Sequence, residues 1–320
     1  MRSLFRFLLS AILAAFLAHC PAEAHSFRLP GSISIDQIIS GDSSSCVIPF
    51  TRAGNLILIR ARVDTTTGNF VLDTGAPRLV MNIIYFRRYA TACDIHLGGI
   101  TGTADMACRT TVDSLGFGPV RYSRVEAELV DLSPIEDKKG VKILGLLGLE
   151  LFQRFEMIID YSTQLIYLHQ IPRRNPIPYH NPQLADTTAY HTIPVRIEDG
   201  KLIVPGYIHG RKLKFIVDSG AETSVLDSRL PDIVLKAVTI TRRVTLTGVG
   251  PGKTDSFYGS IEGLRIGNWD VDSLPVLITN LQSMRDAYED SGLNGMLGFD
   301  FPSLHKIGFN FVDRKMYIWK

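Results

Sequence analysis

The sequence Phe-Val-Leu-Asp-Thr-Gly-Ala at residues 70–76 occurs again, in slightly changed form, as Phe-Ile-Val-Asp-Ser-Gly-Ala at residues 215–221. One such motif is weak evidence of function, because Asp and Gly directly after a strand are also common in ordinary turns. Two copies, 145 residues apart, indicate instead that a structural unit is repeated.

Three further segments recur in the same order along the chain. Each pair is 150 residues apart: residues 98–102 with 248–252, 145–150 with 295–300, and 159–168 with 309–318. This spacing is five residues longer than the spacing of the Asp motifs. The second copy is therefore five residues longer than the first between its Asp motif and its glycine-rich turn. We therefore interpret the chain as two copies of one plan.

The length of 320 residues suits two domains of about 150 residues each. The predicted division is a signal peptide at 1–24, a leader at 25–45, an N-terminal lobe at 46–169, a proline-rich connector at 170–190 and a C-terminal lobe at 191–320. Four prolines lie between residues 170 and 182, which excludes a helix or strand interior there and favours an extended connector.

The first 24 residues have the organisation of a secretion signal. Arg2 and Arg6 precede an apolar run from Leu8 to Ala18, and Ala22-Glu23-Ala24 fits the small-x-small pattern of a cleavage site. The alternative, a membrane anchor, needs about 20 apolar residues, and this run is shorter. We expect an exported protein, periplasmic or secreted, without stable membrane insertion after the signal is cleaved.

Composition and charge exclude several classes of protein. Hydrophobic residues make up 45% of the chain and charged residues 21%, which is close to a globular average and excludes a disordered chain. Thirty-four Lys and Arg against 32 Asp and Glu leave a net charge of +2 without any block of like charge, so nucleic acid is not expected as a partner. The eight His residues show no metal-ligand spacing, and no Gly-x-Ser-x-Gly motif occurs, so neither a metal nor a cofactor is expected.

The local pattern around each Asp motif is that of a β-hairpin. Residues 56–63 and 69–72 form a predicted strand–turn–strand unit, and residues 201–208 and 213–217 repeat it. Both hairpins end at an Asp motif. Residues 149–155 are predicted to form a short helix.

If the two lobes pair about a pseudo-two-fold axis, the Asp motifs meet at that axis. Two carboxylates about 3 Å apart cannot both ionise, so Asp73 and Asp218 would share one proton. A water held between them can lose a proton to one carboxylate while the other donates a proton to a substrate carbonyl, which is general acid–base hydrolysis.

The residues next to each Asp would support this arrangement. Gly75 and Gly220 would allow each turn to approach its neighbour closely. The hydroxyls of Thr74 and Ser219 can form hydrogen bonds across the interface and hold the two turns in register.

These motifs resemble those of the aspartic protease clan, which includes the retropepsins and the two-lobed pepsin-like enzymes. The resemblance rests on residues 73–76 and 218–221, each followed by an apolar-apolar-Gly element at 146–148 and 296–298, and it covers about residues 50–320. The Ala after each motif is more similar to a retropepsin than to a pepsin. The resemblance implies a mainly β fold of two similar, closed-barrel-like retropepsin-type lobes related by a pseudo-two-fold axis, with a peptide-binding cleft between them.

The chain departs from the viral members of this clan in two ways. The Arg that viral members carry after the apolar-apolar-Gly element is replaced by Leu149-Glu150 and Phe299-Asp300. Both halves also lie in one chain, as in a tandem duplication. We therefore expect a monomer that contains an intramolecular pseudo-dimer, although a homodimer with one lobe per site is an alternative.

The resemblance also implies that the glycine-rich turns are the tips of flaps that contact the substrate. The predicted flap residues are Gly99, Ile100, Thr101, Gly250, Pro251 and Gly252. Residues 248–254 superficially resemble a phosphate-binding loop, but one residue is missing between the first Gly and Gly-Lys-Thr. A hairpin tip is the better interpretation.

Three cysteines remain after removal of the signal: Cys46, Cys93 and Cys108. Cys93 and Cys108 are nearly equidistant from the first flap tip, so they would face one another in a hairpin that closes there. A disulfide between them would persist outside the cytoplasm. The alternative is two unpaired thiols, and the partner of Cys46 is left open.

The sequence therefore predicts an exported aspartic endopeptidase that hydrolyses peptide bonds with a water activated between Asp73 and Asp218. Its partner would be a peptide or protein substrate bound in an extended conformation. The alternative is a catalytically silent peptide-binding module with the same two-lobed fold. Retention of both Asp residues argues against that alternative, because a binding module gains nothing from two carboxylates forced together.

Overall fold

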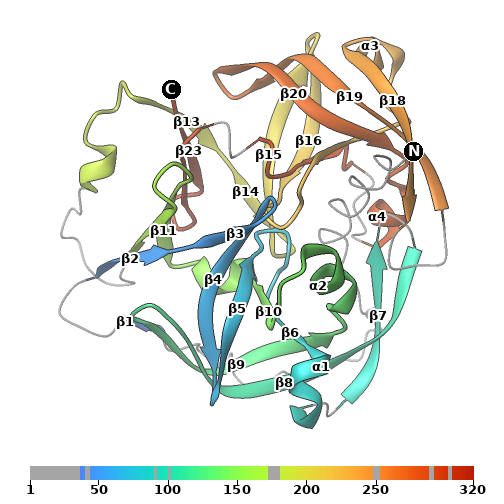
Figure 1. The fold of residues 1–320 in the computed structure, drawn as a ribbon. Helices are drawn as coiled ribbons and strands as arrows, with labels where there is room; N and C mark the ends of the chain where they lie inside the picture. The colour runs from blue at the N-terminus through green and yellow to red at the C-terminus, as the bar shows by residue number, and fades with distance from the viewer. Residues whose placement is uncertain are drawn as a thin grey trace, which may run out of the picture.

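The computed structural model describes residues 37–39, 44–89, 92–99, 102–171, 181–247, 253–287, 292–301 and 305–320. Strands dominate this part of the chain and form two lobes with a sheet between them (Figure 1). None of the helices in these residues is both long enough and apolar enough to span a membrane.

Six strands of the N-terminal lobe close into a barrel. In the order of pairing they are β4 (Leu56–Val63), β5 (Thr66–Leu72), β10 (Gly145–Leu147), β6 (Leu79–Asn82), β9 (Val120–Val130) and β8 (Gly102–Phe117). The ring closes because β8 pairs with both β9 and β4. Strands β3 (Thr51–Ala53) and β7 (Ala92–Gly99) extend it, and helices α1 (Ile83–Phe86), η2 (Arg87–Tyr89) and α2 (Ser133–Lys139) follow barrel strands.

The C-terminal lobe closes in the same order of pairing. Its ring is β15 (Lys201–Ile208), β16 (Arg211–Val217), β21 (Gly295–Leu297), β17 (Ser224–Asp227), β20 (Trp269–Thr279) and β19 (Lys253–Ile266). Pairing of β15 with β19 closes the ring. Strands β14 (Arg196–Glu198) and β18 (Val238–Thr247) extend it, with helices α3 (Asp232–Leu235) and α4 (Gln282–Ala287).

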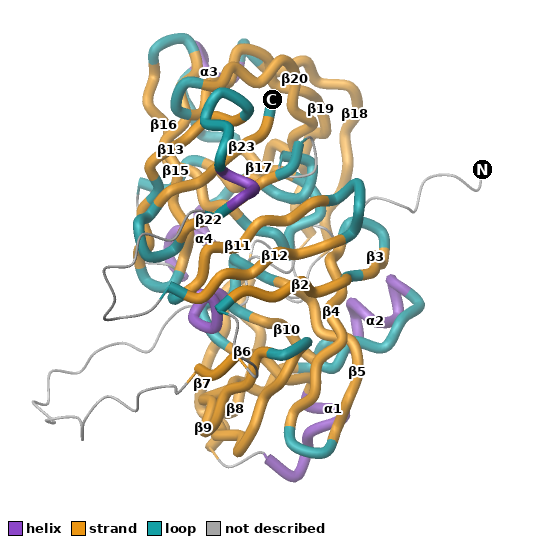
Figure 2. The backbone as a smooth tube through the Cα atoms, turned by 90° about the vertical axis from the view of Figure 1, so that its left-hand side faces the viewer, coloured by secondary structure: helices purple, strands orange, loops and turns teal. Residues whose placement is uncertain are grey.

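A six-stranded antiparallel sheet joins the two barrels. Its order is β13 (Tyr190–Pro194), β23 (Lys315–Trp319), β22 (Ile307–Asn310), β11 (Phe155–Asp160), β12 (Leu165–Gln170) and β2 (Ser45–Pro49). Three strands come from each half of the chain, and β11 pairs directly with β22. Figure 2 shows β11, β12 and β2 side by side between the lobes.

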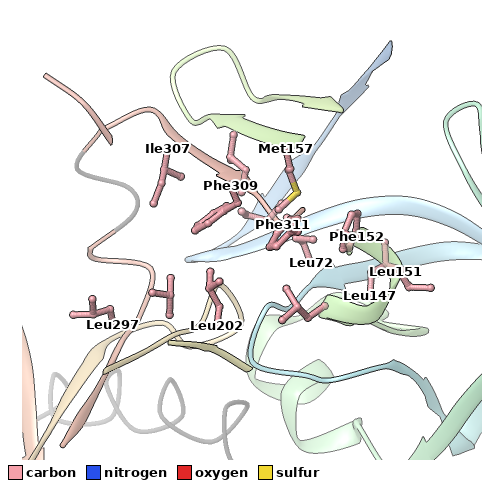
Figure 3. Packing of buried hydrophobic residues seen from close by; sticks show 14 of the residues in the cluster. Leu72, Leu147, Leu151, Phe152, Met157, Leu202, Leu297, Ile307, Phe309 and Phe311 are labelled. Carbon is pink, nitrogen blue, oxygen red and sulfur yellow. The ribbon is translucent and has the colours of Figure 1, made fainter. Parts of the chain in front are cut away.

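A continuous apolar core runs from one barrel to the other beneath this sheet. Met157 and Phe309 of the sheet are buried in the same cluster as Leu72 of one barrel and Leu202 of the other. Figure 3 shows these side chains packed together, with Phe311 among them. Burial of large aliphatic and aromatic side chains on both sides of the sheet stabilises the two lobes as one body.

The mainly β, two-lobed fold and both predicted hairpins are confirmed. The helix predicted at 149–155 is wrong beyond its first turn. Only Leu149–Phe152 is helical, as the 3₁₀ helix η3, and β11 begins at Phe155 because the central sheet takes up the buried segment that follows.

Part of the predicted leader also has regular structure. Residues Gln37–Ile39 form β1, which pairs with β9 in antiparallel fashion. Part of the predicted connector, residues 172–180, lies outside the described residues, and the short helix η4 (Pro182–Leu184) lies in its described part. The domain boundaries thus remain a prediction.

Candidate active site

Asp73 and Asp218 lie directly after the last residues of β5 and β16. The Asp73 N–H donates to Leu147 O at 3.1 Å, and the Asp218 N–H donates to Leu297 O at 2.9 Å. These bonds continue the parallel pairing of β5 with β10 and of β16 with β21. The apolar-apolar-Gly elements therefore lie beside the Asp motifs and fix where each Asp leaves its strand.

Thr74 and Ser219 join the two Asp motifs across the interface between the lobes. The Thr74 N–H donates to Ser219 Oγ at 3.0 Å, and the Ser219 N–H donates to Thr74 Oγ1 at 2.9 Å. Each hydroxyl then donates onward to the opposite lobe, Thr74 to Val217 O at 3.0 Å and Ser219 to Leu72 O at 2.8 Å. The four bonds are buried and nearly symmetric, so they hold the two turns in a fixed register.

Gly75 and Gly220 lie against the carboxylate of the opposite lobe. A Cβ atom on Gly75 would lie 2.4 Å from Asp218 Cγ, and one on Gly220 would lie 2.5 Å from Asp73 Cγ. No side chain fits at either position. The absence of Cβ at both glycines is what lets the two carboxylates approach one another.

Both carboxyl groups are fully buried, and one oxygen of each is held by its own turn. Asp73 Oδ1 accepts from the N–H groups of Gly75 at 2.9 Å and Ala76 at 3.0 Å. Asp218 Oδ1 accepts from Gly220 at 2.8 Å and Ala221 at 3.2 Å. The Oδ2 atoms of both residues are buried without a hydrogen-bond partner among the described residues. These two oxygens are the atoms available to a reacting water or substrate group.

Burial and proximity raise the pKa of both carboxyl groups. Burial, followed by the charge of Asp218, raises the pKa of Asp73 well above its ordinary value, against the lowering effect of the Ala76 and Gly75 N–H groups. Burial also raises the pKa of Asp218. Two acids that interact this closely titrate as a pair, so the site can hold one shared proton.

The residue after each Asp-x-Gly-Ala motif contacts a hairpin turn of the other lobe, which the sequence analysis missed. Glu222 forms an ion pair with Lys139 of α2, and its backbone O accepts from Asn55 Nδ2 at 3.1 Å. A Cβ on Gly200, whose φ is +71°, would lie 2.5 Å from Pro77 Cβ. Because residues 77 and 222 occupy the same place in the two copies, the repeat itself was the signal that could have identified them.

A further acid, Asp300, lies half-buried in the C-terminal lobe. Asp300 Oδ1 accepts from the N–H of Ser224 at 2.9 Å and from its hydroxyl at 2.5 Å. Ser224 Oγ in turn accepts from the Gly298 N–H at 3.0 Å. Burial raises the pKa of Asp300 to about 6, although the Ser224 bonds oppose the shift. This acid ties β17 to the turn after the apolar-apolar-Gly element.

The flap residues are placed only in part. Hairpins β7–β8 and β18–β19 stand where flaps were predicted, and Gly99 is the last residue of β7. The predicted tip residues Ile100, Thr101, Gly250, Pro251 and Gly252 lie outside the described residues. Their role remains a prediction.

The cysteines agree in part with the predicted pairing. The register of β7 and β8 places Cys93 opposite Cys108. Cys108 is disulfide-bonded, whereas Cys46 is free. The register supports Cys93 as the partner of Cys108, and we retain that pairing as a proposal. Within the described ranges, no group of three or more His, Cys, Asp or Glu side chains is placed to hold a metal ion.

Comparison with known proteins agrees with this fold. Residues 204–301 match a family model described as aspartyl protease. The chain is similar in structure to the aspartic proteinase from Irpex lacteus, with 11% identity, a TM-score of 0.50, and coverage of 86% of this chain and 97% of that one. A search by sequence among curated proteins found no match.

Two seed proteins also match by structure, each at 10% identity and each over 86% of this chain and 94% of the other. They are conglutin gamma, a basic 7S globulin from lupine seeds, with a TM-score of 0.48, and basic 7S globulin from soybean, with a TM-score of 0.46. The family match and the two-barrel fold fit the aspartic protease clan.

Proposed function

We propose that the protein is an exported aspartic endopeptidase with Asp73 and Asp218 as its catalytic pair. The observation that carries this proposal is the placement of two buried carboxyl groups against each other's turns. Each has one oxygen held by backbone N–H groups and one oxygen without a partner among the described residues.

The geometry suits activation of a water without a covalent intermediate. The ionised carboxylate takes a proton from the water, whose oxygen attacks the carbonyl carbon of the peptide bond. The protonated partner donates its proton to the carbonyl oxygen, which gives a neutral tetrahedral intermediate. When the carbon–nitrogen bond breaks, the carboxyl group that took a proton from the water gives a proton to the leaving amine. The other carboxylate takes a proton from a hydroxyl of the intermediate, so the pair again holds a single shared proton.

A substrate would bind in an extended conformation between the lobes. The hairpins β7–β8 and β18–β19 supply strands that can pair with a peptide backbone, as in β-augmentation. Export rests on the sequence pattern of residues 1–24.

A silent peptide-binding module is the competing function, and cleavage distinguishes the two. The purified protein would be incubated with a mixed peptide library at several pH values, with and without pepstatin, and products identified by mass spectrometry. Internal cleavage that pepstatin blocks and that the Asp218→Asn variant lacks supports the proposal. Peptides retained by both proteins but cut by neither would establish the binding module instead.

A further inference from the structure

Two contacts join the N-terminal lobe to the residue that follows the C-terminal Asp motif. Glu222 comes directly after Ala221, whose N–H donates to Asp218 Oδ1 at 3.2 Å. The Glu222 carboxylate forms an ion pair with Lys139, and its backbone O accepts from Asn55 Nδ2 at 3.1 Å. The side chain and the main chain of one residue are therefore both held by the opposite lobe.

Both contacts come from segments that are fixed to the N-terminal barrel. Lys139 is the last residue of α2, and Glu136 joins this helix to β6. Asn55 lies in the turn between β3 and β4. The side chains of Lys139 and Glu222 are only 9% and 16% exposed, so salt screens their attraction less than it screens a surface pair.

The N-terminal Asp motif has an apolar contact in the same place. Pro77 takes the place of Glu222 in the first copy, and Gly200 takes the place of Asn55 in the second. A Cβ on Gly200 would lie 2.5 Å from Pro77 Cβ, so these two residues also lie against one another. Pro77 has neither a charged side chain nor a backbone N–H. The contact between the lobes is thus apolar at one motif and charged at the other, and the fold does not by itself require the ion pair.

We propose that Lys139 is a positioning residue for Asp218 and that it acts through Glu222 and the turn of the C-terminal Asp motif. This inference rests on the proposed peptidase function. Asp218 Oδ1 accepts from the N–H groups of Gly220 and Ala221, which favour the ionised form and leave Oδ2 without a partner among the described residues. An ion pair that holds Glu222 in place therefore keeps the Ala221 N–H directed at the carboxylate.

Two further charged groups lie close enough to affect the test. Asp73 faces Asp218 and titrates with it. Lys138, the neighbour of Lys139 on α2, interacts electrostatically with Glu222. A Lys139→Met variant therefore removes the direct ion pair but leaves one positive charge near Glu222.

Steady-state kinetics of Lys139→Met test the proposal. We expect kcat to fall about tenfold, because a slightly misplaced catalytic group is costly, and KM to change by less than about twofold. The acid limb of the pH profile should move up by about half a unit, because weaker N–H donors raise the pKa of Asp218. Lys214→Met is the matched control. It breaks an ion pair with Glu198, at 2.7 Å, whose two residues lie outside both Asp motifs, and it should leave all three values unchanged.

Two further changes separate the ion pair from general stability. Asn55→Ala removes the other contact with Glu222 and should change kcat and the acid limb in the same direction, by less. Lys139→Glu alone places two acids together and should be the most impaired variant. Combining it with Glu222→Lys exchanges the charges and should recover most of the lost kcat. Thermal unfolding of each variant checks that the fold is intact, and a merely structural role would leave kcat and the acid limb of folded variants unchanged.

Carbon-13 NMR of protein labelled at the aspartate carboxyl groups gives a measurement that does not need peptidase activity. The resonance that is absent from Asp218→Asn identifies Asp218. Its titration midpoint should rise by about half a unit in Lys139→Met and stay in place in Lys214→Met. If the unchanged protein cleaves no peptide while the midpoint rises in Lys139→Met, the proposed function is wrong and the positioning role of Lys139 stands.

Three results would overturn the positioning role. The first is an unchanged kcat and an unchanged Asp218 midpoint in a folded Lys139→Met variant. The second is an equal change in Lys214→Met, which would show that any lost ion pair has this effect. The third is a folded charge-exchanged variant that recovers none of the activity lost in Lys139→Glu.

Discussion

The two lobes are nearly identical at the Asp motifs, but they differ in the polar contacts that lie behind the motifs. At the motifs, each hydrogen bond of one lobe has a counterpart in the other. Behind them, polar contacts join each barrel to the helix that follows its long hairpin, and the acid of these contacts is on the helix in one lobe and on the strand in the other.

In the N-terminal lobe the acid is on the helix. Glu136 of α2 accepts from Asn82 Nδ2 at 3.1 Å, from the Tyr85 hydroxyl at 2.8 Å and from the Ile143 N–H at 2.7 Å. Asn82 is the last residue of β6. One carboxylate therefore joins the helix to the strand and to the segment before β10.

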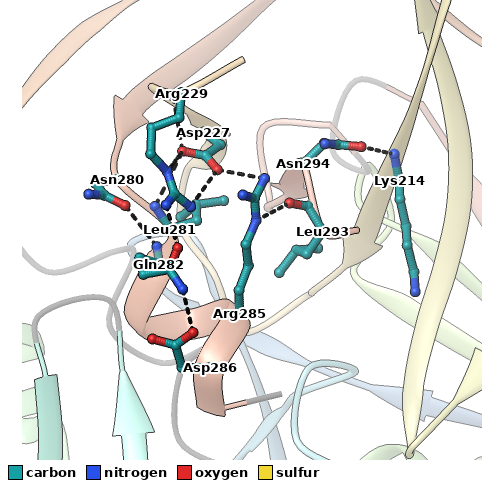
Figure 4. Close-up of polar contacts among 10 residues, drawn as sticks. All are labelled: Lys214, Asp227, Arg229, Asn280, Leu281, Gln282, Arg285, Asp286, Leu293 and Asn294. Carbon is teal, nitrogen blue, oxygen red and sulfur yellow. Dashed lines mark hydrogen bonds and ion pairs between the residues drawn. The ribbon is translucent and has the colours of Figure 1, made fainter. Parts of the chain in front are cut away.

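In the C-terminal lobe the acid is on the strand. Asp227, the last residue of β17, is fully buried and forms an ion pair with Arg285 of α4 at 2.7 Å (Figure 4). The Arg285 Nε also donates to Leu293 O at 2.7 Å. The fold thus requires a polar contact at this position but not a particular residue, whereas the reaction proposed at the Asp motifs requires the residues themselves.

The largest expected effect tests the equality of the two lobes at the site. Asp73→Asn and Asp218→Asn should each lower kcat/KM by at least about 10²- to 10⁴-fold, because either change removes one member of the acid–base pair. The fold should persist in both, since the pKa of each buried acid is raised and its charged form is unfavourable there. Peptide cleavage assays and thermal unfolding provide the measurements. Near-full activity in one variant would show that the lobes do not share the reaction.

The next effect concerns the polar contacts of Glu136 in the N-terminal lobe and of Asp227 in the C-terminal lobe. Arg285→Met should lower the free energy of unfolding by about 3 kcal/mol. It leaves the Asp227 carboxylate buried, and among the described residues Arg229, at 3.2 Å, is then its remaining charged partner. Glu136→Gln in the other lobe should cost about 1 kcal/mol, since a neutral acceptor remains. Denaturant titration of both variants measures the difference. Equal losses of unfolding free energy in the two variants would mean that the difference in charge between the two contacts has no energetic consequence.

The contrast between the lobes also explains how much the sequence could predict. Asp73, Thr74 and Gly75 were identified with their partners because the close contact between the two turns permits few side chains, so the repeat is visible there. Asn82 and Asp227 both join the end of a barrel strand to a helix, but one is neutral and the other is charged. No sequence motif is shared between them, so the sequence did not indicate this contact.

The central sheet was not predicted for a different reason. Its strands come from distant segments, and β11 pairs with β22 about half a chain length away. The apolar residues of Phe155–Asp160 indicate only that the segment is buried. A segment this short can be buried as either a helix or a strand. The helix predicted at 149–155 was wrong because that pairing partner was unknown.

A smaller effect distinguishes the two flap hairpins. The register pairs Cys93 with Cys108 in β7–β8, whereas Arg243 faces Phe257 at the corresponding place in β18–β19. Cys93→Ser combined with Cys108→Ser should lower the free energy of unfolding by about 2 kcal/mol and increase amide exchange in β7–β8. Exchange in β18–β19 should not change. Mass mapping of non-reduced peptides is the control, and a bridge from Cys108 to any other cysteine would contradict the pairing.

The smallest effect is a shift of pH dependence that both lobes should share. Ala76 and Ala221 are buried and donate only a backbone N–H to the carboxylates, so no hydroxyl stabilises the ionised form from these positions. Burial therefore dominates, the pKa of the pair is raised, and the bell-shaped profile of kcat/KM should be centred at mildly acidic pH rather than near pH 2.

Changing Ala76 and Ala221 to Ser adds that donor. A buried hydroxyl needs an acceptor, and the carboxylate that already accepts from the backbone N–H of residue 76 or 221 can serve as one. Hydrogen bonds to the ionised form lower its pKa, so the acid limb of the double variant should move to lower pH by about half a unit to one unit. Each single variant should move it by less. If the limb stays in place, or if the unchanged protein already peaks in strong acid, groups other than residues 76 and 221 determine the ionisation of the pair.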